Sequence, residues 1–261
     1  MSAMAYYRPT SVAEAAQLAA SDPAARIIAG GQSVLPSLKL GLLTPTAFID
    51  LAGITELQGI RASGSSITIG AMTTHAAVAA SGEVRSLIPA LATLAAGIGD
   101  RQVRNRGTIG GSIANNDPAA DYPAAVLGLN AIIRTNRREL AADGFFTGVY
   151  ATQLAPGELI TAVEFPVPNR AAYVKLPQPA SRFALVGVFV AQTSQGARVA
   201  VTGAGASVFR VKTLEEALTR RFAPEACEGV TVTAAELNQD IHGSAEYRAY
   251  LIPVLAQRAV H

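Results

Sequence analysis

Cysteine is almost absent from the chain, because Cys227 is the single one among 261 residues. One thiol cannot form an internal disulfide, and it cannot supply the ligands of a cysteine-rich metal or iron–sulfur site. Tryptophan is absent and aromatic residues make up 6% of the chain, which argues against a stacking platform for single-stranded nucleic acid. Lysine and arginine (21) exceed aspartate and glutamate (19) by two, an excess too small to indicate a nucleic-acid-binding surface.

Long apolar runs are also missing. No stretch approaches the roughly 20 apolar residues of a membrane-spanning helix, since glycine, proline and charges interrupt the alanine-rich segments. The first residues hold no apolar core of a signal peptide, so we expect a soluble protein of the cytoplasm. Hydrophobic residues make up 50% of the chain and charged ones 15%, which excludes an intrinsically disordered chain. The length suits one large domain or two modest ones.

Hydrophobic periodicity and turn residues predict a mixture of helices and strands. Ser11 followed by Glu14 has the spacing of a capping box, which predicts a helix with Ser11 as its N-cap. Residues 97–116 are predicted as a loop rich in glycine and arginine, and Pro166-Val-Pro-Asn is the expected domain boundary. Helices are expected at 11–21, over most of 73–94, after Asp117 at 118–129, at 212–220 and at 244–259, and a short helix or turn at 33–42. Strands are expected at 26–29, 46–51, 66–70, 131–135, 158–166, 183–192 and 197–205.

A first pair of glycines follows the apolar strand predicted at 26–29. Adjacent glycines expose several backbone N–H groups and let a bulky anion approach the chain closely, which suits a pyrophosphate. A serine hydroxyl adds a further donor. The alternative is an ordinary tight turn between a strand and a helix. The residues of this first loop are Ile28, Ala29, Gly30, Gly31, Gln32, Ser33, Val34 and Leu35.

A second pair of glycines begins a loop that is dense in polar groups and flanked by apolar residues. Buried polar groups need partners, and a ligand with hydroxyls and ring heteroatoms would supply them. The alternatives are an Asx-rich capped loop with Asp117 as a helix N-cap, or a divalent-metal site, for which the carboxylates are few. The candidate residues of this second loop are Thr108, Ile109, Gly110, Gly111, Ser112, Asn115, Asn116, Asp117 and Asp121.

Two further segments are less specific. Residues 198–208 look like a strand entering a dinucleotide-binding fingerprint, but Val208 stands where the third small residue is required, so a hairpin or strand turn is predicted. The basic run 101–107 is interpreted as a solvated loop, a docking surface or a neighbour of a phosphate.

Isolated reactive residues receive structural interpretations. We interpret His75, at an expected helix start, as a capping residue rather than a catalytic one. His242 lies in a predicted loop, and Cys227 has no histidine neighbour and is expected to be an inert surface or packing residue. If the chain is an enzyme, a cofactor carries its difficult chemistry.

Taken together, the two glycine loops and their flanking motifs resemble the FAD-binding medium subunits of the molybdenum hydroxylases, the family of xanthine dehydrogenase and carbon monoxide dehydrogenase. The resemblance extends over almost the whole chain. Gln32 stands where many members have histidine. The motifs that carry the resemblance are Tyr7-Arg-Pro, Ala29-Gly-Gly-Gln-Ser, Ile69-Gly-Ala-Met-Thr-Thr, Gln102-Val-Arg-Asn-Arg-Gly, Thr108-Ile-Gly-Gly-Ser, Asp117-Pro-Ala-Ala-Asp, Pro156-Gly-Glu-Leu-Ile and Ser244-Ala-Glu-Tyr-Arg-Ala-Tyr-Leu.

This resemblance implies an α+β fold of the vanillyl-alcohol-oxidase-like (PCMH-type) FAD-binding class. Its expected parts are FAD-binding subdomain 1 at 1–53, FAD-binding subdomain 2 at 54–168 and a C-terminal α+β domain at 169–261. Non-covalent FAD would lie between the first two, with the two glycine loops holding its diphosphate and ribityl chain.

The resemblance also implies further cofactor contacts. Asp121 would accept hydrogen bonds from the cofactor, and Ile98 and Leu159 would line it. Lys175 would lie near the pyrimidine edge of the flavin, where a cation stabilises the reduced ring. Phe183 would lie against the isoalloxazine.

The implied function is that of an electron-transfer subunit. Electrons would come from [2Fe–2S] clusters of a small partner subunit, after substrate is oxidised at a molybdenum cofactor in a large one, and would leave to an external acceptor. The expected assembly is a dimer of heterotrimers. The chain's single cysteine means that the clusters belong to a partner. Two alternatives remain open: a self-contained FAD-dependent oxidoreductase acting on a small organic substrate, and a non-enzymatic nucleotide-binding or scaffold protein.

Overall fold

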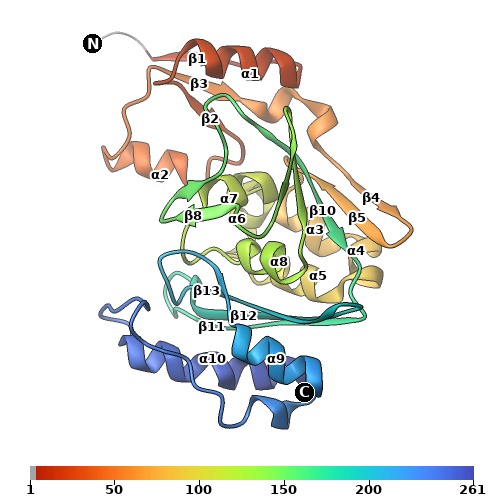
Figure 1. The fold of residues 1–261 in the computed structure, drawn as a ribbon. Helices are drawn as coiled ribbons and strands as arrows, with labels where there is room; N and C mark the ends of the chain where they lie inside the picture. The colour runs from red at the N-terminus through yellow and green to blue at the C-terminus, as the bar shows by residue number, and fades with distance from the viewer. Residues whose placement is uncertain (1–3) are drawn as a thin grey trace.

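The computed structural model describes residues 4–261 and contains three main sheets (Figure 1). The first sheet is parallel, with the strand order β1–β3–β2. The predicted N-cap is confirmed at its helix α1, where the Ser11 hydroxyl accepts a hydrogen bond from the Glu14 N–H at 3.2 Å. The Glu14 carboxylate accepts from the Thr10 N–H at 2.9 Å, one residue before the N–H that a capping box would use. The elements of this part are β1 (Ala5–Tyr7), α1 (Val12–Ser21), β2 (Arg26–Ile28), α2 (Val34–Lys39), β3 (Ala47–Asp50), η1 (Leu51–Gly53) and η2 (Thr55–Leu57).

The second sheet is antiparallel and has the strand order β4–β5–β10–β6–β7. Its helices α3 to α8 form the long connection between β5 and β6. The expected helical stretch 73–94 is present as three helices, with Pro89 at the first position of α5, where no donor is lost. The elements are β4 (Ile60–Ser63), β5 (Ser66–Gly70), α3 (His75–Ala80), α4 (Gly82–Leu87), α5 (Pro89–Ala96), α6 (Arg101–Arg106), α7 (Ile109–Asn115), α8 (Tyr122–Gly128), β6 (Ile132–Thr135), β7 (Glu139–Ala141), β8 (Phe146–Gly148), β9 (Ala151–Thr152) and β10 (Ile160–Pro166).

The third sheet is antiparallel, with the order β11–β12–β13–β14, and lies between α8 on one face and α9 and α10 on the other (Figure 1). This placement explains why β12 is apolar on both faces. Phe189 and Ala191 pack into the core of the second sheet, whereas Val188 and Val190 pack into the core beneath α10. The elements are β11 (Arg170–Pro177), β12 (Ala184–Thr193), β13 (Gly196–Thr202), β14 (Phe209–Arg210), α9 (Lys212–Arg220), η3 (Pro224–Cys227) and α10 (Ala245–Val260).

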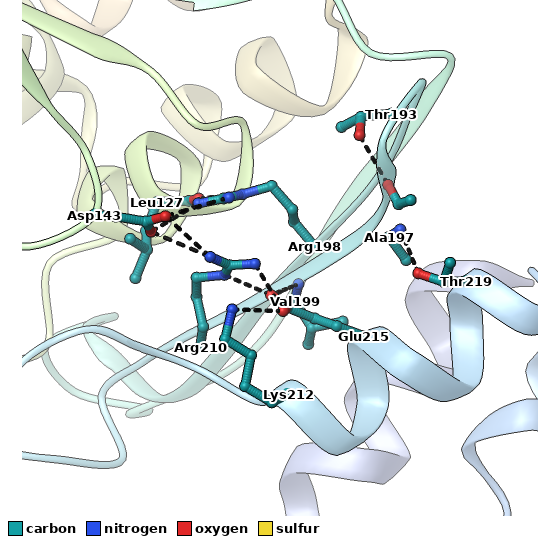
Figure 2. Close-up of polar contacts among 11 residues, drawn as sticks. Leu127, Asp143, Thr193, Ala197, Arg198, Val199, Arg210, Lys212, Glu215 and Thr219 are labelled. Carbon is teal, nitrogen blue, oxygen red and sulfur yellow. Dashed lines mark hydrogen bonds and ion pairs between the residues drawn. The ribbon is translucent and has the colours of Figure 1, made fainter.

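A network of charged side chains also joins the third sheet to the loop that follows β7 of the second sheet (Figure 2). Arg198 and Arg210 both pair with Asp143, at 2.8 and 3.0 Å. Arg210 also pairs with the buried Glu215, which accepts a hydrogen bond from the Val199 N–H at 3.0 Å. Because each acid is shared by several donors, the network fixes α9 and β13 to the loop that follows β7.

The prediction of a loop at 97–116 is wrong, because most of it is helical. Asp100 caps α6 by accepting from the Val103 N–H at 2.8 Å, and Thr108 caps α7 by accepting from the Gly111 N–H at 3.1 Å. The glycine pair, a turn signal by propensity, lies inside α7 because tertiary packing requires it there. The helix expected directly after Asp117 begins later, at Tyr122.

The strand β11 was not expected from the sequence, and it pairs with β12 along its whole length. Residues 198–208 are confirmed as a strand and turn. Cys227 is buried in the core of the third sheet, as a packing residue. Within residues 4–261, no helix has the length and apolar character needed to cross a membrane.

Candidate functional site

A cavity of about 770 Å³ lies where the first and second sheets meet, and both glycine loops line it. Its volume falls in the range of small-molecule and cofactor sites. The candidate residues that do not line it are Ile28, Leu35, Ile109, Asn116 and Lys175. The predicted site residues that line it are Ala29, Gly30, Gly31, Gln32, Ser33, Val34, Ile98, Thr108, Gly110, Gly111, Ser112, Asn115, Asp117, Asp121, Leu159 and Phe183.

The two loops touch, although they lie far apart in the sequence. A Cβ atom placed on Gly30 would lie 2.6 Å from the carbonyl carbon of Arg106 and 2.7 Å from the Cα of Gly107. A Cβ atom on Gly111 would lie 3.6 Å from the Cβ of Ala29. Glycine at position 30 is therefore required for the close approach of the loops, which brings the two predicted halves of the site together.

The first loop offers open backbone donors. Gly31 adopts a left-handed conformation (φ +74°), which lets the chain turn from β2 into α2. Among the residues that the structure describes, none accepts a hydrogen bond from the N–H groups of residues 30–34. The Ser33 hydroxyl likewise makes no cap to α2. Consecutive unpaired N–H groups facing a cavity form an anion-binding concavity.

The second loop does not offer such donors, and this part of the prediction is wrong. The Gly110 N–H donates to the Ala71 carbonyl at 2.9 Å, and the Gly111 N–H donates to the Thr108 hydroxyl at 3.1 Å. A Cβ atom on Gly110 would lie 2.6 Å from the Cβ of Ala71, so this glycine serves close packing. What the loop presents to the cavity is polar side chains, those of Thr108, Ser112 and Asn115.

Asp121 is a buried acid on the cavity wall that is fully engaged by the chain. Lys175 Nζ lies 2.9 and 3.1 Å from its two oxygens, and the Tyr173 hydroxyl donates to one of them. Burial raises the pKa of Asp121, and Lys175 and Tyr173 act in the opposite direction. Lys175 also donates to the carbonyls of Gly97 and Arg182, at 3.0 and 3.1 Å. Lys175 thus lies behind Asp121, and its contact with the flavin stays a prediction.

His75 lines the cavity, and its prediction as a cap is wrong, because the Thr74 hydroxyl caps α3. The imidazole is 5% exposed, and its Nδ1 atom has no partner among the described residues. Burial, with a smaller effect of Arg104, lowers the pKa of His75 to about 4, so the ring is neutral at pH 7. A Cβ atom on Gly107 would lie 2.5 Å from His75 Nε2. Glycine at position 107 therefore leaves the space that His75 occupies.

The turn at 155–158 forms another part of the wall and was missed by the sequence interpretation. Glu158 is buried and accepts hydrogen bonds from Arg138 at 3.0 Å and from the Ala155 N–H at 2.9 Å. Chiefly because of the bond from Arg138, its pKa is lowered to about 2. Glu158 belongs to the motif Pro156-Gly-Glu-Leu-Ile, but the sequence does not show that it is a buried ion-pair partner, because Arg138 lies in another turn.

A cavity lined by a loop with open backbone N–H groups and by a second loop with hydroxyl and amide side chains is typical of a protein that binds a phosphorylated cofactor. Residues 2–168 match the family described as the FAD binding domain in molybdopterin dehydrogenase. The chain therefore belongs to the FAD-binding medium subunits of the molybdenum hydroxylases, a family of oxidoreductases. The open backbone amides, the hydroxyl side chains and the volume of the cavity fit FAD.

Relatives that match over almost their whole length support this family assignment. The nicotine 6-hydroxylase medium subunit of Paenarthrobacter nicotinovorans is 35% identical over 272 residues, which cover 99% of this chain and 96% of that protein. The carbon monoxide dehydrogenase medium chain of Hydrogenophaga pseudoflava is 35% identical over 274 residues, with coverages of 98% and 95%. A chain of the solved, reconstituted carbon monoxide dehydrogenase of Oligotropha carboxidovorans superimposes with a TM-score of 0.91 at 32% identity, covering 99% of this chain and 96% of that one. The predicted family and FAD-binding α+β fold are confirmed.

Proposed function

We propose that this chain is the FAD-carrying electron-transfer subunit of a molybdenum hydroxylase. It takes electrons from the [2Fe–2S] clusters of a small partner subunit and passes them to an external acceptor. The observation that carries the proposal is the row of open N–H groups at residues 30–34, set in the cavity of an FAD-binding domain. The single, buried Cys227 supports a division of labour in which partners hold the metal clusters.

The cavity suggests how this chain holds the cofactor. The N–H groups of residues 30–34 receive the diphosphate, and Thr108, Ser112 and Asn115 face the ribityl hydroxyls. Asp121 and Phe183 would line the flavin, and the wall around Leu159 would hold the adenosine. When bound, FAD supplies the acceptance and release of electrons, while the protein supplies binding, orientation and electrostatics. The first loop holds no histidine or cysteine, which supports non-covalent attachment.

The neutral His75 fits the same arrangement. The ring lines the same cavity and is uncharged at pH 7, so it adds no net charge to the wall. The buried pair of Asp121 and Lys175 is close to neutral as a unit, so the wall on which the flavin would rest carries little net charge.

The proposal includes partners and domain boundaries. The relatives' names, medium subunit and medium chain, support a complex with a large molybdenum-cofactor subunit and a small [2Fe–2S] subunit, which we place in a dimer of heterotrimers. We divide the chain into 1–53, 54–168 and 169–261, because each main sheet draws its strands from one of these ranges.

The test is a visible absorption spectrum of the purified chain, with mass spectrometry of the molecule released on denaturation. Stoichiometric FAD, reduced when the molybdenum and iron–sulfur partners and their substrate are added, is the expected result. FAD reduced directly by an organic substrate without partners would favour the self-contained oxidoreductase. Failure to take up FAD after incubation with an excess would reject both and leave the glycine loops as structural turns.

A further inference from the structure

One wall of the cavity is an irregular segment, residues 116–121, which connects α7 to α8. Asp117, Ala120 and Asp121 of this segment line the cavity. Asn116 begins it in a left-handed conformation (φ 44°). Because the segment belongs to no helix or sheet, its position depends on bonds from elsewhere in the chain.

Asn116 is held by the β8–β9 hairpin, since its side-chain amide donates to the carbonyls of Gly148 and Ala151. The bonds to residues 118–121 come largely from the third sheet. The Thr202 hydroxyl, at the end of β13, lies 2.6 Å from the Ala120 carbonyl oxygen and 3.1 Å from that of Pro118. The next residue, Gly203, donates its N–H to the Pro118 carbonyl at 2.8 Å. Thr202 is 1% exposed and does not line the cavity. Its hydroxyl can therefore affect the shape of the cofactor site only by holding the carbonyl groups of Pro118 and Ala120 in place.

A second contact from the same sheet holds the other end of the segment. The Tyr173 hydroxyl of β11 donates to Asp121, whose carboxylate also accepts from Lys175 of the same strand. The sequence makes room for this contact, since a Cβ atom on Gly187 would collide with the Tyr173 hydroxyl. Strand β13 therefore fixes the position of the backbone in this cavity wall, and strand β11 fixes the position of the Asp121 side chain.

We propose that Thr202 is a positioning residue for the FAD site, and that the third sheet acts on the cofactor by fixing residues 116–121. The proposal rests on the proposed function, because it needs FAD to occupy this cavity. It gives the C-terminal part of the chain a role in cofactor binding although the family match ends at residue 168. The physical reason is that carbonyls held by a buried hydroxyl cannot turn toward the cavity, so the wall keeps the shape that the ligand meets.

The experiment compares variants of the full-length chain for FAD affinity, measured by quenching of flavin fluorescence. Thr202→Val removes the hydroxyl at nearly constant volume, and Thr202→Ser keeps it. The matched control is Thr193→Val, since the Thr193 hydroxyl of the same sheet also donates to a backbone carbonyl, that of Gly196 at 2.8 Å, but at the opposite end of β13 (Figure 2). Visible circular dichroism of the bound flavin and thermal melting of the FAD-free chain complete the set.

The expected result is a roughly 3- to 30-fold weaker FAD affinity for Thr202→Val, with an altered visible circular dichroism spectrum. Thr202→Ser restores both, and Thr193→Val changes neither, even if it lowers the melting temperature. Should Thr202→Val fail to fold, Tyr173→Phe takes its place and is expected to weaken FAD binding in the same direction.

Two results would overturn the proposal. One is a folded Thr202→Val, or in its place Tyr173→Phe, that binds FAD with unchanged affinity and spectrum. The other is an equal loss of affinity in Thr193→Val, which would indicate general destabilisation of the sheet. Either result leaves the proposed function intact if the unmodified chain binds FAD. An unmodified chain that takes up no FAD would reject the proposed function and this proposal together.

Discussion

Replacing Gly30 with alanine tests the contact between the two glycine loops. The added Cβ atom would collide with the Arg106 carbonyl oxygen and lie 2.6 Å from the carbonyl carbon, whereas real Cβ atoms stay beyond 3.0 Å, so the loops must separate by more than about 0.4 Å. Both neighbours are backbone atoms, and no side-chain rotation relieves the clash. Overpacking of this kind costs about 1–3 kcal/mol, which corresponds to roughly 5- to 150-fold in an equilibrium constant.

The assay measures urea unfolding and FAD affinity of the full-length chain. Gly30→Ala is expected to lower the free energy of unfolding by about 1–3 kcal/mol and to weaken FAD binding at least about fivefold. In Gly111→Ala the added Cβ would lie 2.9 Å from the Thr108 hydroxyl and at an ordinary contact distance from the Cβ of Ala29, so a smaller effect is expected. Gly82→Ala, at the start of α4 with nothing within 4 Å, is the matched control and should bind FAD normally. Wild-type FAD affinity in Gly30→Ala, or an equal loss in Gly82→Ala, would refute the reasoning.

Three further predictions concern buried side chains that can gain or lose a proton. Arg138 lowers the pKa of the Glu158 carboxyl from 4.5 to about 2, so the stability that this carboxylate contributes is present above about pH 4.5 and is lost as the pH falls toward 2. Thermal melts should therefore show a lower melting temperature for Glu158→Gln than for wild type at pH 7. This difference in melting temperature should shrink as the solution is made acidic. Lys175→Met leaves the Asp121 carboxylate buried without its cation, which should cost about 3–5 kcal/mol in urea unfolding. The double variant Lys175→Met/Asp121→Asn should recover part of that loss, and no recovery would show that the pair is uncoupled. The ring protons of His75, followed by nuclear magnetic resonance, should titrate near pH 4, and a midpoint near 6.5 would contradict its burial.

Elements fixed by local signals were predictable from the sequence. The helix at 212–220 was expected with the bounds that the structure has, Lys212–Arg220, because its apolar residues recur at helical spacing. The helix after Ser11 was expected because a capping box depends on residues three apart in sequence. In both cases the information lies within a few residues of the element itself.

Elements fixed by distant contacts were not predictable in the same way. Strand β11 (Arg170–Pro177) has charged residues and no strong alternation, and it becomes a strand because β12 supplies a partner along its whole length. Helix α7 (Ile109–Asn115) contains two glycines that argue against a helix by propensity. The first of them, Gly110, is needed where α7 packs on Ala71, a contact that no local pattern reveals.

The candidate site was also predictable where local patterns determine it and unpredictable where distant contacts do. Both loops were found from the sequence, because paired glycines next to hydroxyl residues are a visible pattern, and the structure brings them to one cavity. Which of their donors are open could not be predicted, because this depends on acceptors elsewhere. The Gly110 N–H is taken by Ala71, on the turn after β5, a partner that only the fold supplies.

The glycines of the two loops are required for three different physical reasons. At Gly31 the reason is conformational, since φ is +74° and the nearest obstacle is the flexible side chain of Leu35. At Gly30 it is the contact with the backbone of Arg106, and at Gly110 it is packing on Ala71. Only the first loop combines its glycines with open N–H groups, so the cavity lining is asymmetric: the first loop contributes backbone donors, and the second contributes hydroxyl and amide side chains. That asymmetry suits a ligand with a charged diphosphate in its middle and a hydroxylated chain beside it, because backbone amides bind the charge while adaptable side chains meet the hydroxyls.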